Sequence, residues 1–249
     1  MMRISLVTIC WNAEKTLRRA VSSVLAQTRL PDEYLFVDGG STDGTLELLS
    51  ELCATLEKSG VKAWVIPQKR NPGEEGIPSA WNQGIEKVTG DVIGLLNSDD
   101  WYEPQALASV EKAFATHGGA GMVSAAVRFV APGTGKEIKV FRNAPSWQLA
   151  FRMTVPHPGL FVKKSTYDTV GLYDTTYRIS ADYDFVWRCR NAGVTLTAVD
   201  EPLVNMELGG TANRSRALAR RETLEIARKH GGWSILPWVA WLMRALTGR

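Results

Sequence analysis

Acidic side chains directly follow two of the apolar runs that this sequence predicts as buried strands. Asp38 comes after residues 34–37, and Asp99 and Asp100 come after residues 91–96. Ligands of an open α/β sheet bind outside the carboxyl ends of its strands, so these acids are expected to border a cleft. Adjacent carboxylates repel each other unless a cation compensates them. Mg²⁺ or Mn²⁺ is commonly held by one or two carboxylates together with water and phosphate oxygens, so the pair predicts a metal site.

A structural alternative exists for the acidic pair. The segment NSDDWYEP, residues 97–104, also reads as the start of a helix that Asp99 or Asp100 would cap. A two-residue motif is weak, and taken alone it favours the capping interpretation. The decision therefore depends on the elements and motifs around it.

Those elements alternate between short apolar runs and segments of helical period, which is typical of βα units on a largely parallel sheet. The strands predicted in the first half are residues 4–10, 34–37, 61–66 and 91–96, and the helices are residues 14–27, a segment starting at Ile77, and 103–114. The second half is less regular, with strands predicted at residues 121–130, 137–141, 160–162, 195–199 and 203–206 and a helix at 181–191.

Composition sets the protein class. The chain has 249 residues, of which 45% are hydrophobic and 22% charged, which excludes disordered, collagen-like and disulfide-scaffold proteins. This length allows one large α/β domain or two small ones. Three cysteines without a CxxC pair predict reduced thiols and a cytoplasmic location.

Charge is unevenly distributed along the chain. Residues 1–213 carry 21 basic and 24 acidic residues, whereas residues 214–249 carry 8 basic and 2 acidic ones. We therefore predict a catalytic domain at 1–213 and a basic, amphipathic helical tail at 214–249. The tail ends in an apolar segment with Trp233, Trp238 and Trp241, as in helices that lie at a membrane interface. The alternative is a helix packed on the domain or at a dimer interface.

Four ordered motifs, ISLVTICWNAEKTL, VDGGSTDGT, GDVIGLLNSDDWYEP and SADYDF, resemble those of the family 2 glycosyltransferases with a GT-A fold. With HPGLFVKK, GLYD and DEPLV, the chain most resembles the bacterial polysaccharide-assembly branch, over about residues 3–210. The resemblance implies a Rossmann-like, mostly parallel central sheet flanked by helices. It also implies a metal-dependent, inverting hexosyltransferase that moves one sugar from a nucleotide-diphosphate sugar to a hydroxyl.

The resemblance assigns site residues by position. Asp99 and Asp100 match the metal motif and would bind Mn²⁺ or Mg²⁺ bridging the diphosphate of a UDP-sugar, with a GDP-sugar as the alternative. Residues expected at the donor nucleotide sugar are Thr8, Cys10, Asn12, Asp38, Arg70, Asn82 and Asp99. Two departures from the family pattern, Gly39 and Asn97, stand where relatives often carry a second acid, which leaves Asp38 alone at the nucleotide and one fewer carboxylate at the metal.

Asp182 in SADYDF is expected to be the general base that deprotonates the acceptor hydroxyl. Such a base must come from a different part of the chain than the metal ligands, because it acts on the face opposite the leaving group. Its alternative role is an acid in the first turn of a helix, where it favours the helix dipole. Asp184 ranks second as base. His157 is interpreted as a hydrogen-bonded histidine near the site rather than as a metal ligand.

The resemblance also implies partners. The acceptor would be a saccharide, lipid-linked in this branch, and the tail would touch the inner face of the membrane. No transmembrane helix is predicted, because no apolar run reaches the roughly 20 residues that one needs. Nucleic acid is excluded, since the body lacks a basic surface. Two alternatives remain open: transfer to a polyprenyl phosphate, and a catalytically silent sugar-nucleotide-binding protein.

Overall fold

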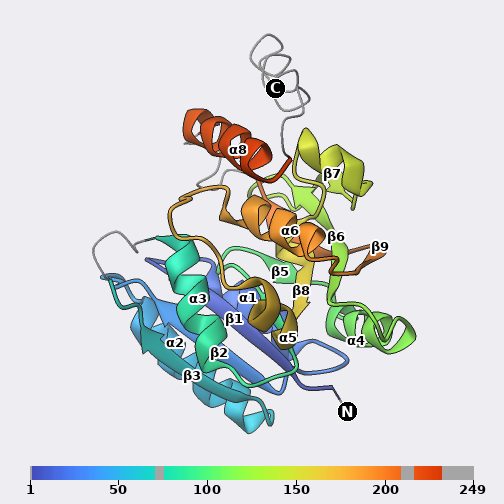
Figure 1. Cartoon of the computed structure of the whole chain (residues 1–249). Helices are drawn as coiled ribbons and strands as arrows, with labels where there is room; N and C mark the ends of the chain where they lie inside the picture. The colour runs from blue at the N-terminus through green and yellow to red at the C-terminus, as the bar shows by residue number, and fades with distance from the viewer. Residues whose placement is uncertain (1, 71–75, 209–215, 232–249) are drawn as a thin grey trace.

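The computed structural model describes residues 2–70, 76–208 and 216–231, and it places a central sheet between layers of helices (Figure 1). The strands are β1 (Ile4–Cys10), β2 (Glu33–Asp38), β3 (Lys62–Pro67), β4 (Val92–Leu95), β5 (Trp101–Tyr102), β6 (Met122–Val130), β7 (Glu137–Phe141), β8 (Leu160–Lys163) and β9 (Leu196–Glu207). The helices are α1 (Leu17–Leu25), α2 (Thr45–Lys58), α3 (Ile77–Lys87), α4 (Ala106–Thr116), α5 (Lys164–Val170), α6 (Ala181–Asn191) and α8 (Arg216–Gly231), with 3₁₀ turns η1 (Ser146–Ala150) and η2 (His157–Gly159).

The first half of the sheet is parallel. Its strands lie in the order β3-β2-β1-β4, and all three pairings run in the same direction. The register pairs Cys10 with Asp38 and Asp38 with Pro67, so the carboxyl ends of three strands meet at one edge. The end of β4 joins them there, because the amide of Leu96 donates to the carbonyl of Val7 over 3.0 Å.

The second half mixes strand directions. β8 is antiparallel to both β4 and β6, β7 and β5 are antiparallel to their partners, and β9 runs parallel to β6. The expected α/β class with helices flanking one central sheet is confirmed. Parallel pairing, however, dominates only in the first half, where βα units alternate.

Side chains alternate between the two faces of the sheet, as the period of a strand requires. Along β1, Ile4 and Leu6 point to a core shared with α1, α2 and α4, whereas Val7 points to a core shared with α3, α5, α6 and α8. Strand β2 repeats the pattern, with Tyr34 and Phe36 on the first face and Leu35 on the second. Both faces of the sheet are thus covered.

Helix α3 approaches the sheet closely because Gly84 has no side chain. A Cβ at Gly84 would lie 2.3 Å from Cγ1 of Val7, closer than a real carbon can come. The glycine therefore lets α3 rest directly on β1, which fixes where the residues at the start of α3 lie relative to the edge of the sheet.

Several predicted elements differ from the structure. The helix expected at residues 14–27 is shorter, Leu17–Leu25, and the helix expected at 103–114 begins and ends later, Ala106–Thr116. The strands expected at 195–199 and 203–206 form one strand, β9, whose register against β6 shifts around Ala126 where the polar run at 200–201 interrupts the apolar pattern. Strand β5 and helix α5 are not in the prediction: β5 has only two residues and forms because β9 lies beside it.

Helix α8, which falls in the predicted tail 214–249, packs against the predicted domain 1–213. Ile226 and Ala227 of α8 are buried in the second core with residues of α3 and α6, and α8 lies beside α6 in Figure 1. For residues 216–231 the structure thus shows a helix packed on the domain, the alternative interpretation of the tail. The interfacial segment with its three tryptophans lies outside the described residues. None of the described helices has the length and apolar character needed to cross a membrane.

Candidate functional site

The loops after β1 and β2 are tied together at the edge of the sheet. The amide of Asn12 donates to the Ser41 hydroxyl over 2.9 Å, and the Asn12 side-chain carbonyl accepts from the amide of Thr42 over 2.8 Å. Asn12 has a φ of 50°, a left-handed conformation that asparagine tolerates better than most residues. Trp11 beside it is 68% exposed, so its ring is open to a ligand.

Asp38 is buried and its carboxylate is held by its own loop. It accepts hydrogen bonds from the amides of Gly40 and Ser41, at 2.8 and 3.0 Å, and from the Ser41 hydroxyl at 2.6 Å. These bonds shape a turn at the end of β2. The guanidinium of Arg70 reaches the same turn and donates to the carbonyl of Gly39. Asp38, Arg70 and Asn12 therefore lie together at the ends of β1 and β2.

Thr8 and Cys10, two of the other four predicted donor residues, are placed differently. The Thr8 hydroxyl is buried, donates to the carbonyl of Leu96 over 2.6 Å and contacts the Tyr34 hydroxyl at 2.8 Å. Cys10 is also buried, and burial, with the charge of Asp38, raises the pKa of its thiol. Both side chains lie beneath the edge of the sheet, where the Thr8 hydroxyl joins β1 to β2 and to the end of β4.

Asn82 of α3 uses both ends of its amide on the backbone of Tyr173. Its nitrogen donates to the Tyr173 carbonyl over 2.8 Å, and its oxygen accepts from the Tyr173 amide over 2.9 Å. This side chain fastens the loop before α6 to α3.

Asp99 and Asp100 differ sharply in their surroundings. Asp99 is exposed, and its backbone carbonyl accepts from Arg19 of α1 over 2.9 Å. Arg19 also stacks over the ring of Trp101, with its guanidinium carbon 3.9 Å from the ring centre. Sequence reasoning missed Arg19, because its place on α1 gives no sign that it reaches the acidic loop.

Asp100 is fully buried, and one of its oxygens is short of a partner. Oδ2 accepts from the Asn97 amide over 2.9 Å, while Oδ1 has no hydrogen-bond partner among the described residues. Burial, followed by the charge of Asp99, raises the pKa of Asp100 to about 8. A buried carboxyl with an unsatisfied oxygen beside a second carboxylate fits a divalent cation.

The part of the chain that the structure describes holds no cluster of three or more His, Cys, Asp or Glu able to bind a metal alone. A cation at Asp99 and Asp100 would therefore need oxygens from elsewhere. Mg²⁺ and Mn²⁺ sites of this kind take them from water and substrate phosphates. The donor set is thus suited to a metal that arrives with a diphosphate.

Asp182 lies in the first turn of α6, partly exposed. One oxygen accepts from the amide of Tyr183 over 2.8 Å. Burial raises the pKa of Asp182 to about 6, and the charge of Glu222 adds to this, while backbone hydrogen bonds lower it. A carboxylate with a pKa near neutrality can take up a proton and release it again at physiological pH.

Asp184, the second candidate for the base, is committed to ion pairs. It is completely buried, and its two oxygens accept from Arg188 Nε and from a ring nitrogen of His230, each at 2.7 Å. Such a carboxylate joins α6 to α8 and has no free oxygen for a substrate hydroxyl. The structure therefore favours Asp182 over Asp184.

His157 is a buried structural residue, in line with its predicted role. Its Nε2 lies 3.0 Å from the Tyr173 hydroxyl, and its ring lies 4.6 Å from that of Trp81, measured between centres. Burial lowers the pKa of His157 to about 4, so the ring is neutral at physiological pH. It belongs to an aromatic cluster under the loop that Asn82 holds.

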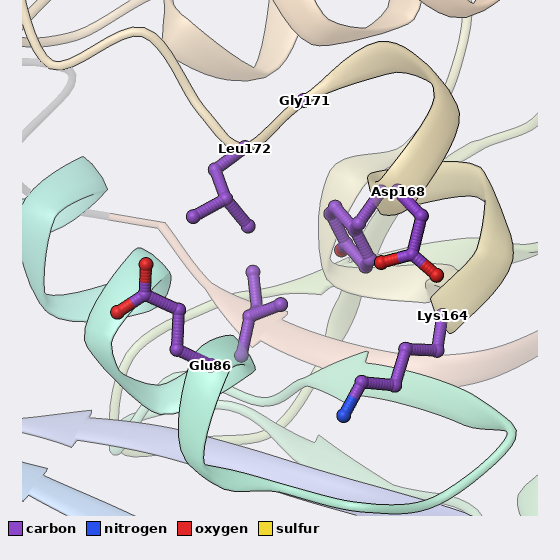
Figure 2. A pocket seen from close by; sticks show the side chains of 7 residues that line it. Glu86, Lys164, Asp168, Gly171 and Leu172 are labelled. Atoms are coloured by element: carbon purple, nitrogen blue, oxygen red, sulfur yellow. The ribbon is translucent and has the colours of Figure 1, made fainter.

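A separate pocket of about 190 Å³ opens between α3 and α5 (Figure 2). It is lined by Ile85, Glu86, Lys164, Tyr167, Asp168, Gly171 and Leu172. None of the predicted site residues lines it. The candidate site is thus the edge formed by the loops after β1, β2 and β4, together with the start of α6.

Comparison with known proteins finds a matching family and relatives in sequence. The model of the family described as "Glycosyl transferase family 2" matches residues 5–163. A PGL/p-HBAD biosynthesis glycosyltransferase of Mycobacterium tuberculosis is 27% identical over 215 residues, which cover 84% of this chain and 78% of the relative. An uncharacterized glycosyltransferase of the same species is 30% identical over 193 residues, covering 74% and 68%.

Solved structures show the same fold. S. aureus TarS, residues 1–349, in complex with UDP-GlcNAc has a TM-score of 0.71 at 16% identity, over 90% of this chain and 64% of TarS. A mannosyltransferase of Pyrobaculum calidifontis in complex with GDP-Man and Mn²⁺ has a TM-score of 0.69 at 16% identity, over 90% and 63%. The chain thus spans just under two thirds of these structures. It has the GT-A fold and belongs to glycosyl transferase family 2.

Proposed function

We propose that this glycosyltransferase is metal-dependent and inverting, and that it moves one sugar from a nucleotide-diphosphate sugar to a hydroxyl of a saccharide. The acceptor oxygen would form a bond to the anomeric carbon while the bond from that carbon to the diphosphate breaks. The hydroxyl proton would pass to Asp182, and the nucleoside diphosphate would leave on the opposite face. A single displacement of this kind inverts the anomeric centre and needs one base.

The observation that carries this proposal is the environment of Asp182. It is a partly exposed carboxylate with a pKa of about 6, whereas both oxygens of the neighbouring Asp184 are already bonded, to Arg188 and to His230. A protein that only binds a sugar nucleotide has no need of a tuned base. A general base contributes about 10² to 10⁴ in rate.

On the donor side, Asn12, Asp38 and Arg70 frame the nucleotide, and Asp99 and Asp100 would hold Mn²⁺ or Mg²⁺. The metal would neutralise the charge that develops on the departing diphosphate. A UDP-sugar is the proposed donor and a GDP-sugar the alternative, since structural neighbours bind UDP-GlcNAc or GDP-Man with Mn²⁺. For Asp38 to bind the base or ribose, the nucleotide must take over bonds that the carboxylate now makes with its own loop.

We further propose a lipid-linked saccharide as acceptor, in the synthesis of a cell-surface polysaccharide, with the protein in the cytoplasm and peripheral on the membrane. The support is the basic character of residues 214–230, which contain six basic residues, and the three tryptophans that follow them. Co-sedimentation with vesicles containing anionic lipid should weaken when residues 232–249 are deleted. Unchanged binding would rule out this role.

Thermal stability with a panel of nucleotide sugars tests the donor side. UDP-glucose, UDP-galactose, UDP-GlcNAc and GDP-mannose are each added with MnCl₂ or with EDTA. A ligand at 100 times its Kd stabilises a protein by about 2.7 kcal/mol, so one donor should raise the melting temperature only when Mn²⁺ is present. Asp99→Asn should lose that dependence. Absence of any metal-dependent shift would contradict both the metal and the enzyme assignment.

Turnover of Asp182→Asn tests the base. Release of nucleotide from the selected donor, with octyl glycosides as acceptors, should fall about 100-fold or more while donor binding is retained. Near-normal turnover would overturn the assignment and favour a polyprenyl phosphate as acceptor, because a phosphate is already ionised and needs no base.

A further inference from the structure

Glu222 of α8 holds the loop that leads into Asp182. Its carboxylate accepts three hydrogen bonds from consecutive backbone amides: Oε1 from Arg178 at 2.9 Å, and Oε2 from Ile179 at 3.0 Å and Ser180 at 2.8 Å. Ser180 directly precedes the first residue of α6, and Asp182 follows two positions later. The donors are 42 to 44 residues away in sequence, so this loop depends on a helix from the end of the described chain.

The Glu222 carboxylate is buried where it meets the loop. Glu222 is 6% exposed, although most of the charged residues of α8 face solvent. Burying a carboxylate is costly unless hydrogen bonds compensate it, and three backbone amides do so here. Removing the carboxylate would leave the three loop amides without partners, because no other acceptor for them is present among the described residues.

Two further contacts fix α8 in place. A ring nitrogen of His230 lies 2.7 Å from Oδ1 of Asp184, and its ring stacks on Trp187 with 16° between the planes. Ile226 and Ala227 are buried between these contacts and Glu222. Glu222 is thus presented to the loop by a helix that is anchored on α6 itself.

We propose that Glu222 is a positioning residue for the general base, and that α8 is therefore part of the catalytic apparatus. This inference rests on the proposed function of Asp182. By holding the three amides before α6, Glu222 sets the direction in which the first turn of α6, and with it the Asp182 carboxylate, points. Displacing a base by about 1 Å can lower the reaction rate about 100-fold.

The charge of Glu222 acts on Asp182 as well. Burial is the largest cause of the raised pKa of Asp182, and the negative charge of Glu222 raises it further. The backbone amides of Asp182 and Tyr183 lower it, and among the described residues the Tyr173 phenol also interacts with it. Removing the charge of Glu222 should lower the pKa of Asp182 and make the base available at lower pH.

The test compares Glu222→Gln with Glu225→Gln in the full chain. Glu225 lies on the same helix but is exposed, so the control removes the same charge without touching the loop. For Glu222→Gln we expect nucleotide release from UDP-GlcNAc or GDP-mannose to fall about tenfold at its plateau, with the acid limb of the pH profile at lower pH. Glu225→Gln should match the wild type.

Glu222→Asp separates the effect of side-chain length from the effect of charge. It keeps the negative charge but is one methylene shorter, so the acid limb should stay close to that of the wild type while the plateau falls. Hydrogen exchange gives a readout without turnover: the amides of residues 178–180 should exchange faster in Glu222→Gln than in Glu225→Gln. If Glu222→Gln folds poorly, hydrogen exchange is compared between Glu222→Asp and Glu225→Gln instead.

The outcomes distinguish the inference from the function beneath it. If Asp182→Asn is impaired but Glu222→Gln keeps the wild-type plateau, acid limb and amide protection, the positioning role of Glu222 is refuted and the base assignment stands. If Asp182→Asn turns over normally, the proposed function fails first, and the inference falls with it. A lower plateau with the acid limb displaced in Glu222→Gln alone supports both.

Discussion

The two sides of the candidate site are built in different ways. On the donor side, the loops after β1 and β2 are held by bonds within a loop or between loops about 30 residues apart. The loop after β4 joins them through bonds between neighbouring strands, from Leu96 to Val7 and from Thr8 to Leu96. The base side, residues 178–184 with α8, is held by bonds that span more than 40 residues. The sheet positions the residues of the donor side, whereas packing between helices positions those of the base side. If this contrast holds, changes on the two sides should differ in their effect on the free energy of unfolding.

The largest effect is expected where a charge is buried on the base side. Arg188→Met removes the 2.7 Å ion pair with Asp184 and the bonds from the guanidinium to the carbonyls of Val170, Gly171 and Leu172. His230 still faces Asp184, so we expect a loss of about 3 kcal/mol in the free energy of unfolding, at the lower end for a broken buried pair. Urea denaturation measures it.

Arg190→Met serves as the control, because Arg190 is exposed on the same helix and stacks on Trp187. It should cost under about 1 kcal/mol. If Arg188→Met cost no more than Arg190→Met, the buried pair would not be what holds the base side.

An intermediate effect is expected from pH through His157. Burial lowers its pKa from 6.5 to about 4, so the unfolded chain takes up a proton below pH 6.5 that the folded state refuses. The stability due to neutral His157 is therefore present above pH 6.5 and is lost as the pH falls toward 4. Between pH 7 and pH 5 this amounts to about 2 kcal/mol.

The unfolding free energy of wild type and His157→Gln, measured across this range, isolates the histidine. Asp182, whose pKa is raised to about 6, changes stability in the opposite direction, but it does so in both proteins. The difference between them should shrink as the pH falls. Parallel curves would contradict the burial of a neutral histidine.

The smallest effect is expected on the donor side, at an ion pair on the surface. Arg18 and Glu51 join α1 to α2 through two 2.8 Å hydrogen bonds, yet both side chains are more than half exposed. Arg18→Met should therefore change the free energy of unfolding by under about 1 kcal/mol. A loss as large as that of Arg188→Met would erase the contrast between the two sides.

Much of the donor side is predictable from sequence, because the residues involved follow strands whose apolar runs are plain. Asp38, Asp99 and Asp100 lie at the ends of β2 and β4, and their loops meet because parallel strands share an edge. Where prediction fell short, the reason is side-chain direction. Thr8 and Cys10 alternate inward from the same strand that presents Asn12, and sequence position alone does not give that orientation at the strand end.

The base side is less predictable. The limits of α6 are as predicted, but nothing in the sequence pairs Glu222 with Arg178, or Asp184 with His230. The excess of basic residues in 214–230 favours a solvated or membrane-facing helix, and this hides the one acid that turns inward. Packing across 40 residues is a tertiary property, so periodicity does not reveal it.

The bonds between α6 and α8 have a consequence for exchanging parts between related enzymes. The family model ends at residue 163, but the helix that carries Asp182 and the helix that restrains it both come later. A chimera joined between residues 191 and 216 would take the helix with the proposed base, Asp182, from one parent and the helix with Glu222 from the other. We therefore expect chimeras to keep activity when residues 178–231 all come from one parent. Their acceptor preference should follow that parent, and their donor preference should follow the parent that supplies the preceding strands.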